Sequence, residues 1–484
     1  MPIPADTIFA RASGAGRAGV AVFRVSGPGA HVLAEKLSRR KIAARRPILA
    51  RLFDPGTGEE IDRGLVILFK GPASFTGEDV AEFYLHGSRA VEAAFAEAAA
   101  ALGARPAGAG EFTRRALQNG KLDLAQVEAL ADLIDAETSL QRKQALGQFE
   151  GRLSGLAEGW RKRLIAVLAP LEAAIDFPDE EDVPAAIAAR AGPEINALIA
   201  ELKSYLARAS RARRLREGVS VAIIGAPNAG KSSLLNALAG SDVAIVAATP
   251  GTTRDIVETR LDLAGVPVLV ADTAGLRDQT TDEIEAEGMR RALARAAAAD
   301  LRILVIDPLP PLEKGGSEFG ASRIPGGDQS ATGLVSDPPL PPLFKGGNTT
   351  ALEARFGSPL RRGDIVVWSK ADLGGKAGTP PDGVAGVVVS AKTGAGIDEL
   401  VLILTERGRA LAGGSESAAL TRLRHVQAVE AAIDALTRAR ERLAEPELAA
   451  EDARLAARAL GEITGAVGVE DLLDEIFASF CIGK

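Results

Sequence analysis

The feature that most constrains this chain is a glycine-rich segment between a strand-like run and a helix-like run. Residues 225–232 read GAPNAGKS, which fits the pattern G-x-x-x-x-G-K-S. The β-branched run 219–224 precedes it, and SSLLNALAG, which favours a helix, follows Lys231. Glycines let consecutive backbone N–H groups turn toward phosphate oxygens at the positive end of a helix. The segment predicts a phosphate-binding loop in which Lys231 reaches the β- and γ-phosphates and Ser232 binds Mg²⁺.

Strand-like and helix-like segments alternate around this loop. The strand-like runs are rich in β-branched residues and cover residues 219–224, 266–270, 301–306, 365–368 and 384–389. Strands that alternate with helices form parallel sheets. We therefore expect an inserted P-loop domain with a mainly parallel sheet over residues 218–412.

The rest of the chain predicts two further domains. Apolar residues recur at helical spacing over residues 122–217 and again over residues 413–484. These segments are predicted to be the two halves of one helical domain, which pack together although the P-loop domain, residues 218–412, is inserted between them. Residues 1–121 mix strand-like runs with one helical run and predict a mixed α/β domain. The fold class expected is thus multidomain α/β, and 484 residues suffice for about three domains.

Residues 308–361 break the pattern of the nucleotide-binding domain. Two similar segments, DPLPPLEKGG from Asp307 and DPPLPPLFKGG from Asp337, are joined by Gly/Ser-rich sequence with little periodicity. Such a segment cannot bury enough apolar surface to offset its ordering entropy, so we expect a disordered, passive insertion. A polyproline ligand for an adaptor protein is the alternative.

The net charge, the cysteine count and the distribution of apolar residues limit the kinds of protein that this chain can be. The net charge of -7 means that a nucleic-acid partner must be met by a local basic patch. A single cysteine, Cys481, excludes an internal disulfide framework and fits a reducing cytosol. The chain has neither a run of about 20 apolar residues nor an apolar leader, so we expect a soluble cytoplasmic protein with no membrane contact.

Further motifs follow the predicted strands in the order typical of guanine-nucleotide hydrolases. Thr252-Thr253-Arg254-Asp255 offers hydroxyls for Mg²⁺ and the γ-phosphate, and Asp272-Thr-Ala-Gly275 places a carboxylate beside the metal. Ser369-Lys370-Ala-Asp372 resembles the element that reads guanine, and Ser390-Ala391-Lys392 follows the last strand. We therefore predict GTP hydrolysis. The predicted nucleotide contacts are Asn228, Ala229, Gly230, Lys231, Ser232, Ser233, Ala247, Thr249, Thr252, Thr253, Asp272, Thr273, Ala274, Gly275, Ser369, Lys370, Asp372, Ser390, Ala391 and Lys392.

Two departures from the usual motifs bear on mechanism. Leu276 stands where Ras-like GTPases carry the glutamine that orients the attacking water, so the water must be positioned from elsewhere. Ser369 stands where the guanine-reading element normally begins with asparagine. Losing that amide should weaken nucleotide affinity by up to about tenfold, while Asp372 keeps the preference for guanine. On this ground Ser369→Asn should tighten GDP binding.

Long runs outside the nucleotide motifs resemble the bacterial tRNA-modification GTPase family MnmE (TrmE). They are GRAGVAVFRVSG from Gly16, GPASFTGEDVAEFYLHG from Gly71, GEFTRRALQNGKLDLAQVEALADLIDA from Gly110, AAIDFPDEED from Ala173 and CIGK from Cys481. The resemblance covers nearly the whole chain apart from the insertion. It implies that, with the flavoprotein MnmG in a hetero-oligomer, the chain adds an aminomethyl-type group at C5 of the wobble uridine of certain tRNAs.

The resemblance also implies ligands and roles for particular residues. The first domain would form a homodimer and bind a 5-formyl or methylene tetrahydrofolate through Arg24, Glu82, Lys121 and Lys484. Hydrolysis would depend on K⁺, bound by Asn228 and by the carbonyls of Ala247, Thr249 and Thr252, and on Mg²⁺, bound by Ser232 and Thr253. Glu285 would orient water, with Lys231 as the other catalytic residue.

The residues alone leave alternatives open. Arg254 and Arg277 are candidates for arginine fingers or for salt bridges, and Arg24, Glu82 and Lys121 read as solvated charges without the family. His86 reads as structural, and Cys481 has no assigned role. A regulatory ribosome-assembly GTPase, which binds RNA without modifying it, is the alternative function.

Overall fold

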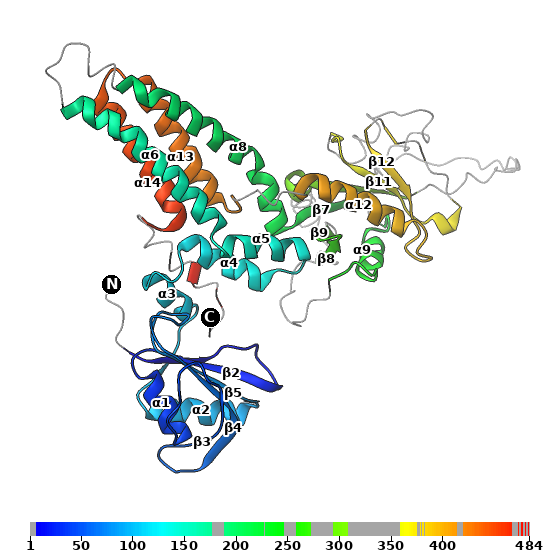
Figure 1. Ribbon diagram of the computed structural model, residues 1–484. Coiled ribbons are helices and arrows are strands. Elements are labelled where there is room, and N and C mark those ends of the chain that lie inside the picture. Colours follow the sequence, from blue (N-terminus) through cyan, green and yellow to red (C-terminus); the bar gives the residue numbers. More distant parts are fainter. Residues whose placement is uncertain are drawn as a thin grey trace, which may run out of the picture. The chain divides into compact units, whose positions relative to one another are not determined.

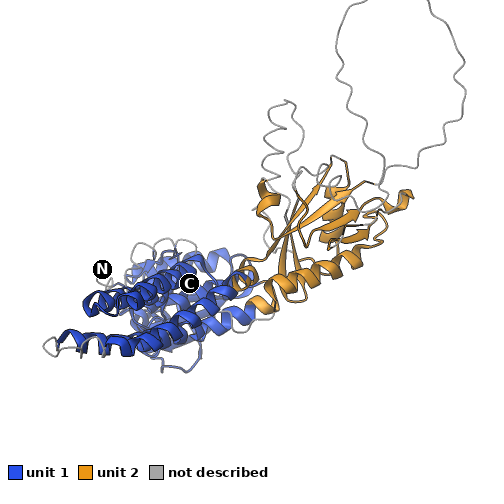
Figure 2. Cartoon of the chain, turned by 90° about the horizontal axis from the view of Figure 1, so that it is seen from above, with its two compact units in different colours: residues 1–136, 142–210, 417–484 blue, residues 137–141, 211–416 orange. Residues whose placement is uncertain are grey.

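The computed structural model shows two compact units (Figures 1 and 2). One comprises residues 1–136, 142–210 and 417–484, and the other comprises residues 137–141 and 211–416. The residues described are 6–176, 188–226, 228–245, 258–272, 294–307, 359–374, 378, 380–381, 383–413, 420–466, 473, 476–477, 480 and 483. Among them no helix is long and apolar enough to cross a membrane.

The amino-terminal domain is a six-stranded sheet with its core on one face. The strand order is β3-β4-β5-β2-β1-β6, antiparallel except for the β1–β6 pair. Phe95 of α2 packs on Phe23 and Phe83, with ring centroids 4.8 and 5.0 Å apart. The elements are β1 (Ile8–Arg11), β2 (Ala18–Ser26), α1 (Ala30–Ser38), β3 (Ile48–Phe53), β4 (Glu60–Phe69), β5 (Val80–Gly87), α2 (Arg89–Ala101), β6 (Arg105–Pro106) and α3 (Glu111–Gln118).

The helical domain has one core built from both halves predicted by the sequence. Trp160 and Leu164 of α6 share this core with Val429 and Leu436 of α13. The helices are α4 (Leu124–Asp135), α5 (Ser139–Phe149), α6 (Arg152–Asp176), α8 (Gly192–Glu217), α13 (Leu423–Glu441) and α14 (Pro446–Thr464), with a short 3-10 helix η1 (Ala189–Ala191).

The nucleotide-binding domain is a six-stranded sheet of order β12-β11-β10-β7-β9-β8. All its strand pairs are parallel except β8–β9. The five predicted strands are present, β8 is an additional edge strand, and the predicted fold class is confirmed. The elements are β7 (Val219–Gly225), α9 (Lys231–Ala239), β8 (Glu258–Leu263), β9 (Val266–Asp272), β10 (Leu301–Ile306), β11 (Ile365–Trp368), η2 (Ala371–Leu373), β12 (Ala385–Val388) and α12 (Ile397–Ala412).

The start of α5 belongs to the nucleotide-binding unit, although the sequence suggested the helical domain. Leu140 packs against the core of that unit. Arg260 Nη1 donates to Glu137 Oε1 at 2.8 Å, and Gln141 Nε2 donates to the Arg216 carbonyl at 3.0 Å. This first turn is attached through contacts that are distant in sequence and therefore leave no local pattern.

The end of the predicted insertion is anchored to the sheet. Arg302, which is 2% exposed, forms an ion pair with Asp364 and donates to the Pro359 carbonyl at 2.7 Å. The Arg361 amide donates to Asp364 Oδ2, also at 2.7 Å. The anchored chain thus resumes at residue 359 and not after 361, while residues 308–358 lie outside the described part.

Candidate functional site

The phosphate-binding loop lies between β7 and α9, as the motif predicts. A Cβ at Gly225 would stand 2.6 Å from the Val305 carbonyl of β10, so only glycine fits there. Gly230 has φ +95° and Asn228 has φ +59°, both in the left-handed region. These two residues turn the chain directly into α9, which begins at Lys231.

Lys231 points back into the loop. Its ammonium donates to the carbonyls of Gly225 and Ala226, each at 2.9 Å, and the residue is only 8% exposed. Ser232 is exposed on the first turn of α9, beside the lysine. A cation and a hydroxyl at the amino end of a helix fit a nucleotide phosphate and its Mg²⁺.

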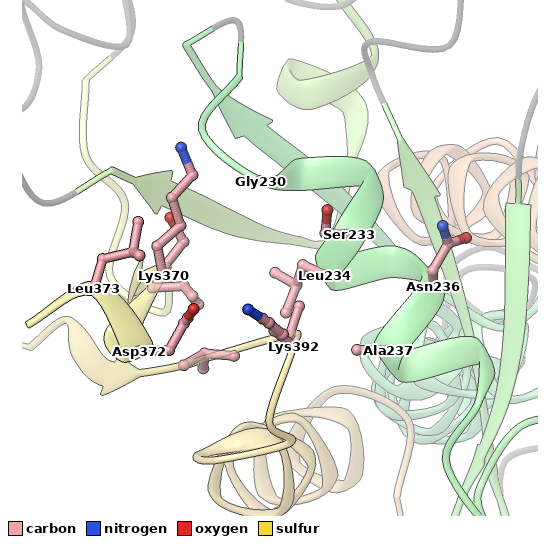
Figure 3. Close-up of a pocket in the computed structure, with 13 residues that line it drawn as sticks. Gly230, Ser233, Leu234, Asn236, Ala237, Lys370, Asp372, Leu373 and Lys392 are labelled. Carbon is pink, nitrogen blue, oxygen red and sulfur yellow. The ribbon is translucent and has the colours of Figure 1, made fainter.

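A cavity of about 590 Å³ opens beside this loop (Figure 3). Gly230, Ser233, Ser369, Asp372 and Lys392 are among the residues that line it. In Figure 3 the Asp372 carboxylate and the Lys392 side chain point into the space between η2 and α9. The residues predicted to read guanine are therefore brought together with the phosphate-binding loop around one cavity.

Asp372 is fixed by the loop that follows β12. The Ser390 hydroxyl donates to Asp372 Oδ1 at 2.7 Å, and this bond, chiefly, holds the pKa of Asp372 below its usual range. The positive charge of Lys392 acts in the same direction. An ionised carboxylate can accept hydrogen bonds from N1–H and the 2-amino group of guanine, which adenine does not offer together.

Residues 369–372, which are predicted to read guanine, form a loop after β11. Ser369 and Lys370 attach this loop to the phosphate-binding loop and to the end of β10. Ser369 is 7% exposed, and its hydroxyl lies 2.6 Å from the Ala229 carbonyl and 3.2 Å from the Ile306 carbonyl. The Lys370 ammonium forms an ion pair with Asp307 at 2.6 Å. The sequence did not anticipate either contact, because both join residues more than 60 positions apart.

Many predicted site residues lie outside the described part of the chain. Asp272 is described only as the last residue of β9, opposite Ile223 of β7. The residues outside the described part are Ala247, Thr249, Thr252, Thr253, Thr273, Ala274, Gly275, Glu285 and Lys484, together with Arg254, Leu276, Arg277 and Cys481.

A second polar site lies on the face of the amino-terminal sheet opposite its core. Arg24 of β2 and Glu82 of β5 are register partners, and Arg24 Nε donates to Glu82 Oε1 at 3.0 Å. The Tyr84 hydroxyl donates to Glu82 Oε2 at 2.9 Å. The guanidinium of Arg24 also stands over the rings of Phe75 and Phe112, 5.3 and 5.7 Å from their centroids. Tyr84 was not predicted, although its spacing of two from Glu82 puts both on one face of a strand.

Lys121 and Gly483 lie against other parts of the same unit. The side chain of Lys121 packs on Gly77, where a Cβ would stand 3.3 Å from Lys121 Cγ. Gly483 packs so closely on the backbone of Arg11 that no Cβ would fit. His86, predicted to be structural, pairs with Asp62 at 2.8 Å.

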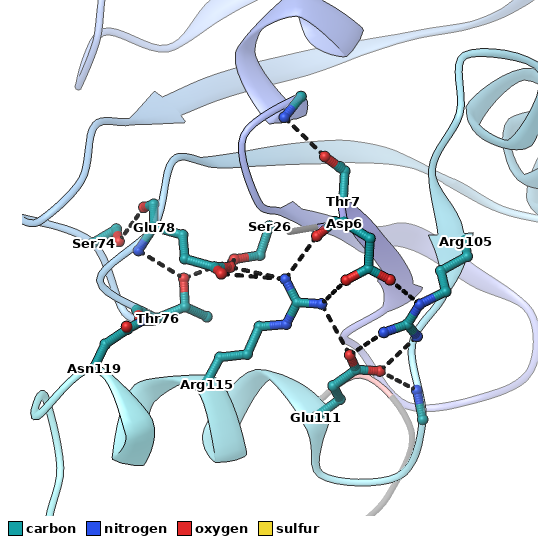
Figure 4. A network of polar contacts seen from close by, with 12 residues as sticks. Asp6, Thr7, Ser26, Ser74, Thr76, Glu78, Arg105, Glu111, Arg115 and Asn119 are labelled. Atoms are coloured by element: carbon teal, nitrogen blue, oxygen red, sulfur yellow. Dashed lines mark hydrogen bonds and ion pairs between the residues drawn. The ribbon is translucent and has the colours of Figure 1, made fainter. Parts of the chain in front are cut away.

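A buried ionic network supports the loop between β4 and β5 (Figure 4). Arg115, which is 1% exposed, donates to Asp6 and Glu111 and reaches Glu78 at 3.2 Å. Glu78 in turn accepts from the Ser26 hydroxyl at 2.7 Å. These residues hold the segment that carries Phe75 next to Arg24.

Comparison with known proteins identifies the family. Residues 7–121 match the family model for the GTP-binding protein TrmE N-terminus, and residues 124–481 match the MnmE helical domain. A protein of Parvibaculum lavamentivorans named tRNA modification GTPase MnmE is 50% identical over 99% of this chain and 100% of its own length. Proteins of that name from Phenylobacterium zucineum and Paramagnetospirillum magneticum are 49% and 47% identical over the same shares. Because such relatives match the chain from end to end, it belongs to the MnmE family of tRNA modification GTPases.

Proposed function

We propose that this GTPase modifies C5 of the wobble uridine of certain tRNAs with an aminomethyl-type group, together with the flavoprotein MnmG. The observation that carries the proposal is one chain with both a guanine-nucleotide cavity and the Arg24–Glu82 site. A GTPase that only regulates RNA binding has no need for the second site. Relatives named for tRNA modification, close to half identical along the full length, support the same reading.

Mass spectrometry of wobble nucleosides tests this proposal. Cells that lack the protein should lose the C5-modified uridines, and the wild-type gene should restore them. Lys231→Ala should fail to restore them, because its ammonium lies within the phosphate-binding loop, on the carbonyls of Gly225 and Ala226. Unchanged nucleosides in the deletion strain would contradict the proposal and favour the ribosome-assembly alternative.

We propose that K⁺ supplies part of the charge stabilisation during hydrolysis. Asn228 is exposed within the phosphate-binding loop, so its side-chain oxygen is available to a cation beside the phosphates. A cation there would neutralise charge that develops in the transition state. We expect GTP turnover to be higher in KCl than in NaCl at equal ionic strength, and Asn228→Ala to remove the difference. Equal rates of the wild type in both salts would refute the potassium mechanism.

We propose that the Arg24–Glu82 site binds a reduced folate, with Lys121 and Lys484. A carboxylate paired with a guanidinium offers acceptors to the N–H groups of a pterin ring, and the half-buried Phe75 gives an apolar wall. Calorimetry with 5-formyltetrahydrofolate should show binding that Arg24→Ala weakens at least tenfold. Arg63→Ala, which breaks an exposed ion pair with Glu60 on the same sheet, is the matched control and should bind normally.

We propose that the open face of this sheet is covered in a homodimer. Leu49, Leu65, Tyr84 and Val22 form one row across four strands, and Leu49 and Leu65 are 69% and 44% exposed. Exposed apolar side chains that are neighbours on a sheet are typical of an interface. Leu49→Asp should shift the protein from dimer to monomer in sedimentation experiments, and a persistent dimer would place the interface elsewhere.

A further inference from the structure

The amino-terminal domain carries a dense run of cations where α1 ends. Residues 36–46, called the basic segment here, join α1 to β3 (Figure 1) and contain no acidic residue. Six of their side chains are positively charged, and all six are exposed: Lys36, Arg39, Arg40, Lys41, Arg45 and Arg46. In a chain with a net charge of -7, this segment is a local reversal of sign.

The protein itself does not neutralise these charges. Within the ranges that the structure describes, none of the six cations forms an ion pair with a carboxylate. Arg51 and Arg63, in the two strands that follow, both pair with Glu60. Like charges that stay unpaired on a surface repel one another, and a bound polyanion relieves this repulsion.

The fold holds the basic segment in a fixed shape. Ile42 is 8% exposed and anchors the middle of the segment in the core of the domain. The Arg45 amide donates to the Leu68 carbonyl of β4 at 2.7 Å. The guanidinium of Arg39 stands over the ring of Phe53, 4.1 Å from its centroid. A guanidinium stacked on a ring keeps its N–H edge free for phosphate oxygens, so the charge is presented from a fixed surface.

Two of the arginines occupy backbone positions that favour glycine. Arg39 has φ +54° and Arg45 has φ +60°, both in the left-handed region. Arg39 also ends α1, where glycine is the commonest residue in this conformation. Since glycine would be less strained at both positions, the arginine side chains favour a role in binding.

The basic segment contacts the loop that borders the Arg24–Glu82 site. Arg45 Nη2 donates to the Ala73 carbonyl at 2.6 Å. Ala73 lies in the loop between β4 and β5, and the same loop carries Phe75 against Arg24. A polyanion on the basic segment would therefore run close to the second polar site of this domain.

We propose that the basic segment binds the phosphodiester backbone of tRNA. Guanidinium groups, which make up four of the six cations, match phosphate oxygens in bidentate geometry. Contacts to the backbone position a nucleic acid without reading its sequence. The segment is the local basic patch that a nucleic-acid partner of this acidic chain requires. The choice of tRNA, in preference to an acidic protein, rests on the proposed function and on the family to which the chain belongs.

The affinity of the full chain for an unmodified tRNA transcript tests the proposal. Arg40, Lys41 and Arg46 make no side-chain hydrogen bond or ion pair with the described residues, so replacing all three with glutamine should leave the fold intact. At about 0.1 M KCl the triple variant should raise the Kd at least tenfold, and the slope of log Kd against log salt should fall by about 2–3, because each phosphate contact contributes nearly one. Turnover of GTP without tRNA should stay at the wild-type rate.

Three exposed cations of the helical domain give the matched control. Arg190, Lys203 and Arg458 form no ion pair within the described ranges, and replacing them with glutamine removes the same total charge. This control should keep the Kd for tRNA within twofold of the wild type. A Kd of the basic-segment variant within twofold of the control, or an unchanged salt slope, would overturn the proposal. Unaltered tRNA binding combined with lost binding to phosphatidylglycerol vesicles or to an acidic partner protein would overturn it too.

Arg39→Gly separates binding from stability. Glycine relieves the left-handed backbone, so the variant should unfold at the wild-type Tm or above it while its Kd for tRNA rises about threefold. A lower Tm with unchanged tRNA affinity would give Arg39 a purely structural role and contradict its part in the proposal. The proposed modification activity is tested separately by the wobble nucleosides of the deletion strain, so either result can fail without the other.

Discussion

At the scale of single residues, we propose that base selection depends on Asp372, which lines the cavity beside the phosphate-binding loop. The hydrogen bond from Ser390 lowers the pKa of its carboxyl group, and the charge of Lys392 acts in the same direction. Asp372→Asn replaces one acceptor oxygen with a donor amide, which faces the 2-amino group of guanine unfavourably. We expect this variant to lose at least tenfold in affinity for GDP and to gain relative affinity for XDP, whose C2 carbonyl accepts from the amide. Competition binding with both nucleotides measures the change, and an unaltered GDP to XDP ratio would exclude Asp372 as the base-reading residue.

Glu111 makes the amino-terminal domain sensitive to acid. Burial acts to raise its pKa, but hydrogen bonds from Arg105, the Gly108 amide and Arg115 outweigh it and lower the pKa from 4.5 to about 2. Because the folded pKa is depressed, the stabilisation is complete above pH 4.5 and is lost as the pH falls from 4.5 toward 2. Glu111→Gln should therefore flatten the pH dependence of unfolding in this window, as followed by hydrogen exchange of β1 and β2 amides. Glu97→Gln, an exposed change on α2, should keep the wild-type slope.

At the scale of helices and strands, Glu128 joins the two halves of the helical domain. It lies on α4, is 3% exposed, and accepts from Arg424 through both oxygens and from His425, both on α13. Glu128→Ala leaves His425 buried without this carboxylate and removes the ion pair of the half-buried Arg424, which should cost about 3–5 kcal/mol of unfolding free energy. Urea unfolding followed by Trp160 fluorescence, in a Trp368→Phe background, measures the loss. Glu430→Ala, an exposed change on α13, should cost less than about 0.5 kcal/mol.

Helices and strands were predictable from the sequence where the spacing of apolar residues and the residue types favour the same secondary structure. The central strands β7, β10 and β11 are short β-branched runs buried on both faces, and the sequence predicts them within one residue. The edge strand β8 was missed, although Leu261 and Leu263 alternate with charged residues before the turn at Gly265. The pairing of Arg24 with Glu82 and the bond from Ser369 to Ala229 could not be predicted, because strand register and loop packing bring distant residues together.

At the scale of the whole molecule, the ion pair of Arg302 with Asp364 anchors the chain where it returns to the sheet after the inserted segment. The pair lies next to the register pair Ile303–Ile365, at the end of β11 where the chain enters the strand. Replacing residues 308–358 with a short Gly/Ser linker should therefore retain GDP binding and GTP turnover, since loop length costs only about 0.6 kcal/mol per doubling. Asp364→Ala, by contrast, removes the carboxylate that pairs with the buried guanidinium of Arg302 and should cost about 3–5 kcal/mol of unfolding free energy. Loss of turnover in the linker variant alone would show that the insertion has a role of its own.

The first turn of α5 belongs to the nucleotide-binding unit and packs against its core. Leu140 fills space against Gly265, where a Cβ would stand 2.8 Å from Leu140 Cγ, and Arg260 pairs with Glu137 beside it. Leu140 is half-buried, so Leu140→Ala should lower the unfolding free energy of this unit by about 1–2 kcal/mol, less than for a fully buried leucine. Urea unfolding followed by Trp368 fluorescence, in a Trp160→Phe background, measures the change. Leu146→Ala, on the same helix but 42% exposed and in the other unit, is the control and should leave that transition in place. If both variants behave alike, α5 acts as part of the helical domain only, and the attachment through Leu140 contributes nothing to the nucleotide-binding unit.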